Sequence, residues 1–149
     1  MTQSTAILKA LAMEHGYAPQ NPTVMYEAEW FHGMIVDVIE KPARMALLKD
    51  EPTPEEIAGC VALFEDFADR VEGRLADGRT HSAGDQITWL DFALLAFVTG
   101  IFENPRLKSE AIRNAVSAKF ASCENFARVM APMRELCANS ITNIVESTI

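Results

Sequence analysis

Asp85-Gln86-Ile87-Thr88-Trp89-Leu90-Asp91-Phe92 is the stretch of sequence that decides the fold. Thr88 can accept a hydrogen bond from the backbone N–H of Asp91, and Asp91 can reach back to the N–H of Thr88, which is the capping box of a helix N-terminus. Ile87 and Phe92 occupy the two positions of a hydrophobic staple around the same turn. The stretch therefore predicts the start of a helix, and the apolar run after it predicts that this helix is central and buried.

The segment before this stretch predicts a long amphipathic helix. It begins at Thr53-Pro54-Glu55-Glu56, where a capping threonine, a proline at the first helical position and a second capping box coincide. Apolar residues then recur at steps of three or four, which traces one stripe along the helix. The pattern predicts an end near Asp77-Gly78 and a polar loop over residues 78–86.

A short helix is predicted over residues 4–15, with Gly16 as its stop. Ile7, Leu8 and Leu11 recur on one face of it. This face needs cover from another part of the molecule or from a partner.

A longer helix is predicted over residues 22–48, with a bend at Pro42 because proline cannot donate the intrahelical hydrogen bond. Between Gly33 and Ile39 its sequence is apolar on almost every side. A helix of this kind must be covered on two faces.

Two further helices are predicted after the central one. The first starts at Asn104-Pro105, and Ser122 caps the second, which Pro132 is expected to bend. Residues 138–149 are rich in Ser, Thr and Asn, and their pattern favours neither helix nor strand.

Composition limits the classes of function. The 149 residues suit one domain with a real core, and the formal net charge of −8 argues against nucleic acid as a direct partner. The longest uncharged apolar run, residues 92–102, is too short to cross a bilayer, so we predict no membrane insertion. The first residues lack the pattern of a secretory signal. We therefore expect an intracellular protein, cytoplasmic by default, although an organelle remains open.

Sequence motifs give no catalytic or metal site. Glu29 and His32 have the Glu-x-x-His spacing of di-iron bundles, but neither His15 nor His81 has an acidic residue three positions earlier to complete a second pair. The three cysteines are far apart and form no C-x-x-C pair, so they are interpreted as small buried side chains: Cys60, Cys123 and Cys137. Phosphate-binding and nucleophile motifs are also missing. We predict no metal and no catalytic residue.

Two segments resemble glutathione transferases. The first, Gln3-Ser4-Thr5-Ala6-Ile7-Leu8 followed by Ala10-Leu11-Ala12, is similar to their Gln-Ser-x-Ala-Ile-x-x-Tyr-Leu-Ala segment, with Lys9-Ala10 in place of the usual basic-Tyr pair. The second, residues 85–92, is similar to their Gly-Asp-x-(Leu/Ile)-(Ser/Thr)-x-x-Asp segment, and Thr88 and Asp91 match it residue for residue. The resemblance covers roughly residues 3–137.

The resemblance implies an all-α fold, the C-terminal helical bundle of a glutathione transferase. It divides the chain into a remnant helix of the thioredoxin-fold half, the helical domain and a C-terminal tail: residues 1–16, 22–137 and 138–149. In that family a Tyr, Ser or Cys near the first strand activates the thiol, and this sequence has no corresponding segment. Gln3 and Ser4, which hold the γ-glutamyl end of glutathione in the family, are then a vestigial binding segment. No cofactor is required, and glutathione binds only if the missing half is supplied.

The predicted function is accordingly that of a non-catalytic, truncated module, which acts as a structural or protein-interaction subunit. A protein partner or a second copy is expected to cover the first two helices through these residues: Ile7, Leu8, Leu11 and Ile35.

An enzymatic alternative stays open. The chain would be a fragment or alternative-start form of a glutathione transferase that conjugates glutathione to electrophiles only with the missing half. Tyr26, Trp30 and Met34 would then line the substrate pocket, although core packing explains them equally well. A third possibility, an unrelated ligand-binding bundle, requires both motif matches to be accidental.

Overall fold

The computed structural model describes residues 2–40, 47, 49, 51–104 and 108–141. Its elements in that part of the chain are α1 (Thr2–His15), α2 (Pro22–Glu40), α4 (Pro54–Arg74), the 3₁₀ turn η1 (Leu75–Asp77), α5 (Trp89–Ile101), α6 (Glu110–Ala121) and α7 (Glu124–Leu136). Residues 138–141 are also helical, and no described residue lies in a strand. The predicted all-α fold is confirmed.

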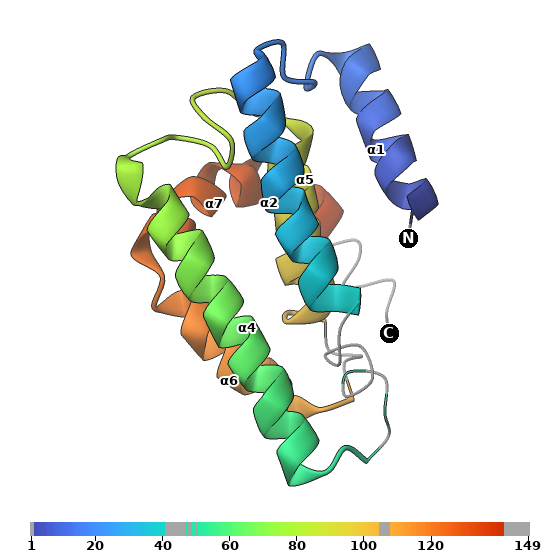
Figure 1. Cartoon of the computed structure of the whole chain (residues 1–149), viewed down its shortest axis with the longest axis vertical. Coiled ribbons are helices and arrows are strands. Elements are labelled where there is room, and N and C mark those ends of the chain that lie inside the picture. The colour runs from blue at the N-terminus through green and yellow to red at the C-terminus, as the bar shows by residue number, and fades with distance from the viewer. Residues whose placement is uncertain (1, 41–46, 48, 50, 105–107, 142–149) are drawn as a thin grey trace.

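The helix α5 forms the centre of the bundle (Figure 1). It packs against α2 and α7, and α4 packs against α6. Seven of the thirteen residues of α5 are buried: Trp89, Leu90, Asp91, Leu94, Leu95, Phe97 and Val98. In Figure 1, α2 and α4 lie at the front of the bundle, whereas α1 lies at one edge. The predicted central position of this helix is therefore confirmed.

Phenylalanines from three helices and the residue after α5 fill much of the core. The Phe102 ring lies edge-on to Phe64, with centroids 4.8 Å apart, and stacks on Phe120 at 5.6 Å. Phe67 contacts Phe97 at 5.3 Å. Each large aromatic removes its apolar surface from water, and the edge-on pairs add a geometric preference. The core therefore ties α4, α5 and α6 together.

Asp91 organises the start of α5 and the loop before it. Thr88 is the N-cap residue, and Thr88 and Asp91 form the capping box. Asp91 is fully buried, and its Oδ2 accepts from the Thr88 N–H at 2.8 Å. Its Oδ1 accepts from the Ser82 N–H, also at 2.8 Å, so one carboxylate satisfies two buried backbone donors.

The predicted start of α4 is confirmed. The Thr53 N–H donates to Glu56 at 2.7 Å, and the Glu56 N–H donates back to the Thr53 hydroxyl at 3.2 Å. The Lys49 ammonium bonds the same carboxylate, and this bond contributes most to lowering the pKa of Glu56. The predicted end is also close, since the 3₁₀ turn stops at Asp77 and Gly78 follows in the left-handed region.

Two predicted helix starts are wrong. The first of the two late helices begins at Glu110 and not at Asn104-Pro105, because Ser109 caps it by accepting from the Ile112 N–H at 3.4 Å. Ser122 ends that helix instead of capping the next, since its hydroxyl donates backwards to the Lys119 carbonyl at 2.7 Å.

Two prolines were expected to bend helices. Pro132 lies inside α7. The predicted bend at Pro42 falls outside the described residues. No helix in the described ranges is both long and apolar enough to span a bilayer.

Candidate interaction surface

The helix α1 has apolar residues on two faces, and the bundle covers only one of them. Ala12 is buried and Leu8 packs partly buried against the core. Ile7 and Leu11, one turn apart on another face, are 61% and 48% exposed. Two large aliphatic side chains therefore project together from a helix at the edge of the bundle.

Polar contacts hold α1 in place. The Lys9 ammonium forms an ion pair with Glu29 of α2 at 2.7 Å and lies 4.8 Å from the centroid of the Trp89 ring. The backbone N–H of Trp89 donates to the backbone carbonyl of Tyr17, which follows α1, at 3.1 Å. His32 lies edge-on to the same tryptophan, and burial, followed by the nearby Lys9 charge, lowers the pKa of His32. Lys9 thus connects α1 to α2 and α5 and adds polar contacts to the apolar packing of Leu8 and Ala12.

The expected position of Ile35 is wrong. Ile35 is 4% exposed and lies with Ala28 and Phe31 on the face of α2 that turns toward the core. This face follows the three- and four-residue spacing of one helix side. The bundle itself covers it, so Ile35 is unavailable to a partner of the folded chain.

The outer face of α2 carries aromatic residues instead. Tyr26 is 66% exposed and Trp30 is 45% exposed. The guanidinium of Arg74 lies 5.7 Å from the centroid of the Trp30 ring, and Arg74 also pairs with Glu27. Gly33 follows one turn later on this side, with open space where a Cβ would stand.

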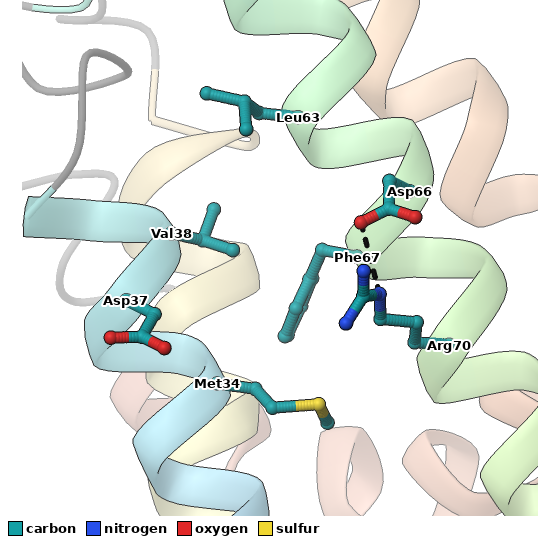
Figure 2. A pocket seen from close by; sticks show the side chains of 7 residues that line it. All are labelled: Met34, Asp37, Val38, Leu63, Asp66, Phe67 and Arg70. Atoms are coloured by element: carbon teal, nitrogen blue, oxygen red, sulfur yellow. Dashed lines mark ion pairs between the residues drawn. The ribbon is translucent and has the colours of Figure 1, made fainter.

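A groove runs between α2 and α4 (Figure 2). Its volume is about 220 Å³, and the residues that line it are Met34, Asp37, Val38, Leu63, Asp66, Phe67 and Arg70. Asp66 and Arg70 pair with each other at 2.9 Å, one helical turn apart. The groove therefore has an apolar floor and a charged rim.

In the cavities lined by described residues, the residues expected to line a substrate pocket do not come together. Met34 lines the groove, whereas neither Tyr26 nor Trp30 does. Gln3 and Ser4 lie in the first turn of α1, where Ser4 is exposed.

A charged cluster that the sequence did not predict lies between the start of α2 and the end of α4. Arg79 bonds both oxygens of Asp77, and this contact is the main reason that the pKa of Asp77 falls to about 2. Arg79 also lies 3.6 Å from Glu27, which pairs with Arg74. A hollow of about 420 Å³ adjoins the cluster. Glu27 and Arg79 are about 50 positions apart, so no local pattern signals their pairing.

The described residues contain no group of side chains suited to bind a metal ion. Among the described residues, no three His, Cys, Asp or Glu side chains are placed to hold an ion. Cys60 and Cys123 are buried, and burial raises the pKa of the Cys60 thiol to about 11. A thiol with a raised pKa is a poor nucleophile.

The fold is that of a glutathione-transferase-like helical bundle. A solved structure described as the crystal structure of the glutathione S-transferase Blo t 8 superposes with a TM-score of 0.76 at 21% sequence identity. The match covers 97% of this chain and 64% of that chain, so the present sequence spans less than two thirds of the transferase. No protein-family model matches the sequence, and no curated protein is significantly similar to it. At this identity the likeness establishes the fold alone.

Proposed function

We propose that this chain is a non-catalytic, glutathione-transferase-like helical module that acts as a structural or protein-interaction subunit. The observation that carries the proposal is the paired exposure of Ile7 and Leu11 on the outer face of α1. Apolar residues exposed singly are ordinary, whereas contiguous exposed apolar patches mark contact surfaces, and Ile7 and Leu11 are neighbours on one face of α1. A protein partner or a second copy covers them.

The outer face of α2 supports the same role. Tyr26 and Trp30 are a third or more exposed although their side chains are large. Tryptophan and tyrosine are enriched among the residues that dominate binding energy in protein interfaces. This face therefore supplies a second set of anchors besides that of α1.

The non-catalytic part of the proposal rests on chemistry. Thiol activation requires a group that stabilises a thiolate. Gln3 and Ser4 belong to the first turn of α1, and a helix N-terminus suits a carboxylate but does not activate a thiol. We therefore treat these two residues as a vestige, with glutathione bound only when a thioredoxin-like half is supplied.

A glutathione-conjugation assay tests this part. The purified chain, incubated with glutathione and a chlorinated nitrobenzene, should give product at the uncatalysed rate. Turnover that scales with protein concentration would contradict the proposal. If the reading frame upstream of Met1 encodes an in-frame thioredoxin-like segment, this finding favours the enzymatic alternative over the proposal. The longer protein should then show turnover.

A dye-binding experiment tests the surface. An environment-sensitive apolar dye should bind the chain, and the double variant Ile7→Ser with Leu11→Ser should lose a large part of the fluorescence gain. The matched control is Leu136→Ser, which changes an equally exposed residue at the far end of the chain. Equal dye binding by all three proteins would argue against a surface on α1.

A further inference from the structure

A second cavity lies where the end of α5 meets α6 and α7. Its volume is about 240 Å³, and it shares no lining residue with the groove between α2 and α4. Its wall comes from Val98 in α5, from Phe102 and Glu103 just after it, and from the facing sides of α6 and α7. Ala121 and Ala127 line it and are exposed, so it opens to solvent on their side.

The wall of this cavity is largely aromatic. The Phe102 ring stacks on Phe120 with centroids 5.6 Å apart, and Phe120 lies 4.9 Å from Phe126. All three are buried, so the core holds their rings in place. Aromatic rings pack well against other rings in offset or edge-on arrangements, and the thioether of Met130 adds a polarisable contact. The wall therefore suits a flat aromatic molecule.

The interior of the cavity offers water few partners. The Ser117 hydroxyl already donates to the Phe102 carbonyl at 3.4 Å. In the described part of the chain, the buried side-chain atoms without a hydrogen-bond partner belong to residues outside this wall: Glu27, Arg74, His81 and Ser82. A buried water needs about two to four polar partners. The interior therefore favours an apolar occupant over water.

The volume of the cavity sets the size of that occupant. An apolar cavity of about 150 Å³ holds one benzene molecule. The present cavity, at about 240 Å³, is larger by more than half. It therefore matches two fused rings better than one.

An ion pair stands at the rim of the cavity. The Arg134 Nη1 group donates to Glu103 Oε2 at 3.0 Å, and Nη2 bonds the other oxygen of the same carboxylate. This two-point contact leaves the rim without net charge. A ligand carboxylate would have to displace Glu103 from Arg134, whereas an uncharged ring system leaves the pair intact. The rim therefore disfavours aromatic anions.

We propose that this cavity binds an uncharged, planar molecule of two fused aromatic rings, and that Glu103 excludes aromatic carboxylates of the same size by neutralising Arg134. The site goes beyond the proposed function and does not rest on it, because none of its residues belongs to α1 or α2. Binding of so small a ligand is weak, with a Kd on the order of 1 mM or below.

Titration of the full chain with β-naphthol tests the site. The signals of isotope-labelled methionine methyl groups are followed by nuclear magnetic resonance. Met130 lines this cavity and Met34 lines the groove between α2 and α4, so each has its own reporter. The ring current of bound naphthol should shift the Met130 signal until it saturates. No saturable shift of Met130 up to the solubility limit of naphthol would overturn the proposal, whatever the Met34 signal does.

Two leucine substitutions at exposed helical alanines form a matched pair. Ala127→Leu places a larger side chain in the opening of the cavity and should weaken naphthol binding about tenfold or more. Ala111→Leu, at the other end of α6 and outside the cavity, should leave binding unchanged. An unchanged Met34 signal shows that each variant keeps the fold. Equal naphthol binding by the two variants would overturn the location of the site.

Glu103→Gln tests the role of the rim. In the wild-type chain at neutral pH, β-naphthol should bind more tightly than the ionised β-naphthoate. The amide no longer neutralises Arg134, so the affinity for naphthoate relative to naphthol should rise about tenfold or more. Glu124→Gln removes the same charge at the exposed start of α7 and should leave this ratio unchanged. A ratio that is the same in the wild-type and Glu103→Gln chains would overturn the proposed selectivity.

Discussion

The Lys9 ammonium lies 2.7 Å from a Glu29 carboxylate oxygen and 4.8 Å from the centroid of the Trp89 ring, so one side chain connects α1 to both α2 and α5. Ala12 is the one residue of the described part of α1 that is buried. This contact, together with the packing of Leu8 and Ala12 against the core, therefore positions α1 and with it Ile7 and Leu11.

The variant Lys9→Gln should loosen α1 selectively. It removes the ion pair and the cation above the ring, each worth about 1 kcal/mol or less at a partly exposed site. Amide hydrogen exchange should accelerate in α1 and stay unchanged in α4. Lys119→Gln, which breaks the exposed pair with Asp69, is the control and should leave α1 unchanged. Equal acceleration in both helices would show that Lys9 supports the whole bundle.

Asp91→Ala should destabilise the fold strongly. The carboxylate is fully buried and accepts from the Ser82 and Thr88 N–H groups, so its removal leaves two buried donors unpaired at a cost of about 3 kcal/mol. Urea unfolding measures the difference. Asp91→Asn keeps one acceptor oxygen and should cost less. Asp85→Ala, exposed in the same loop, should cost almost nothing, and a loss there as large as that of Asp91→Ala would refute the explanation.

The pair of Asp77 with Arg79 should make stability depend on pH in acid. The pKa of Asp77 is lowered from an ordinary value near 3.8 to about 2, so the folded state favours the ionised form. Its contribution is complete above the unfolded pKa and is lost as the pH falls through the folded pKa. The stability difference between wild type and Asp77→Asn should be constant above about pH 5 and shrink between about pH 4 and pH 2. A stability difference between the two proteins that grows as the pH falls would contradict this explanation.

The three cysteines should differ in reactivity. Burial raises the pKa of Cys60 to about 11 and also raises the pKa of Cys123, whereas Cys137 is half-buried. Brief treatment of the native chain with iodoacetamide should label Cys137 first, with the other two labelled after denaturation. Peptide mass mapping gives the order. Early labelling of Cys60 would place it closer to solvent than the fold allows.

Local patterns predicted the helix starts that depend on neighbouring residues. Thr53 and Glu56 cap α4 as expected, because all the groups of a capping box lie within one turn. The same kind of reasoning gave the wrong start for α6, which begins at Glu110. It placed the start at Asn104-Pro105, but a proline favours a helix start without requiring one.

Contacts between distant residues were beyond such reasoning. Whether Ile35 or Trp30 faces outward depends on which side of α2 meets α5, and the nearly continuous apolar sequence around Ile35 does not mark that side. The cluster of Glu27 with Arg74 and Arg79 likewise arises from the packing of α2 beside α4.

Native mass spectrometry of the purified wild-type chain, combined with apolar dye binding, tests the central claim most directly. If the chain is an interaction subunit, it should either assemble above its monomer mass of 16.5 kDa or remain a monomer that binds the dye through Ile7 and Leu11. A stable monomer at every concentration that binds no dye would contradict the account.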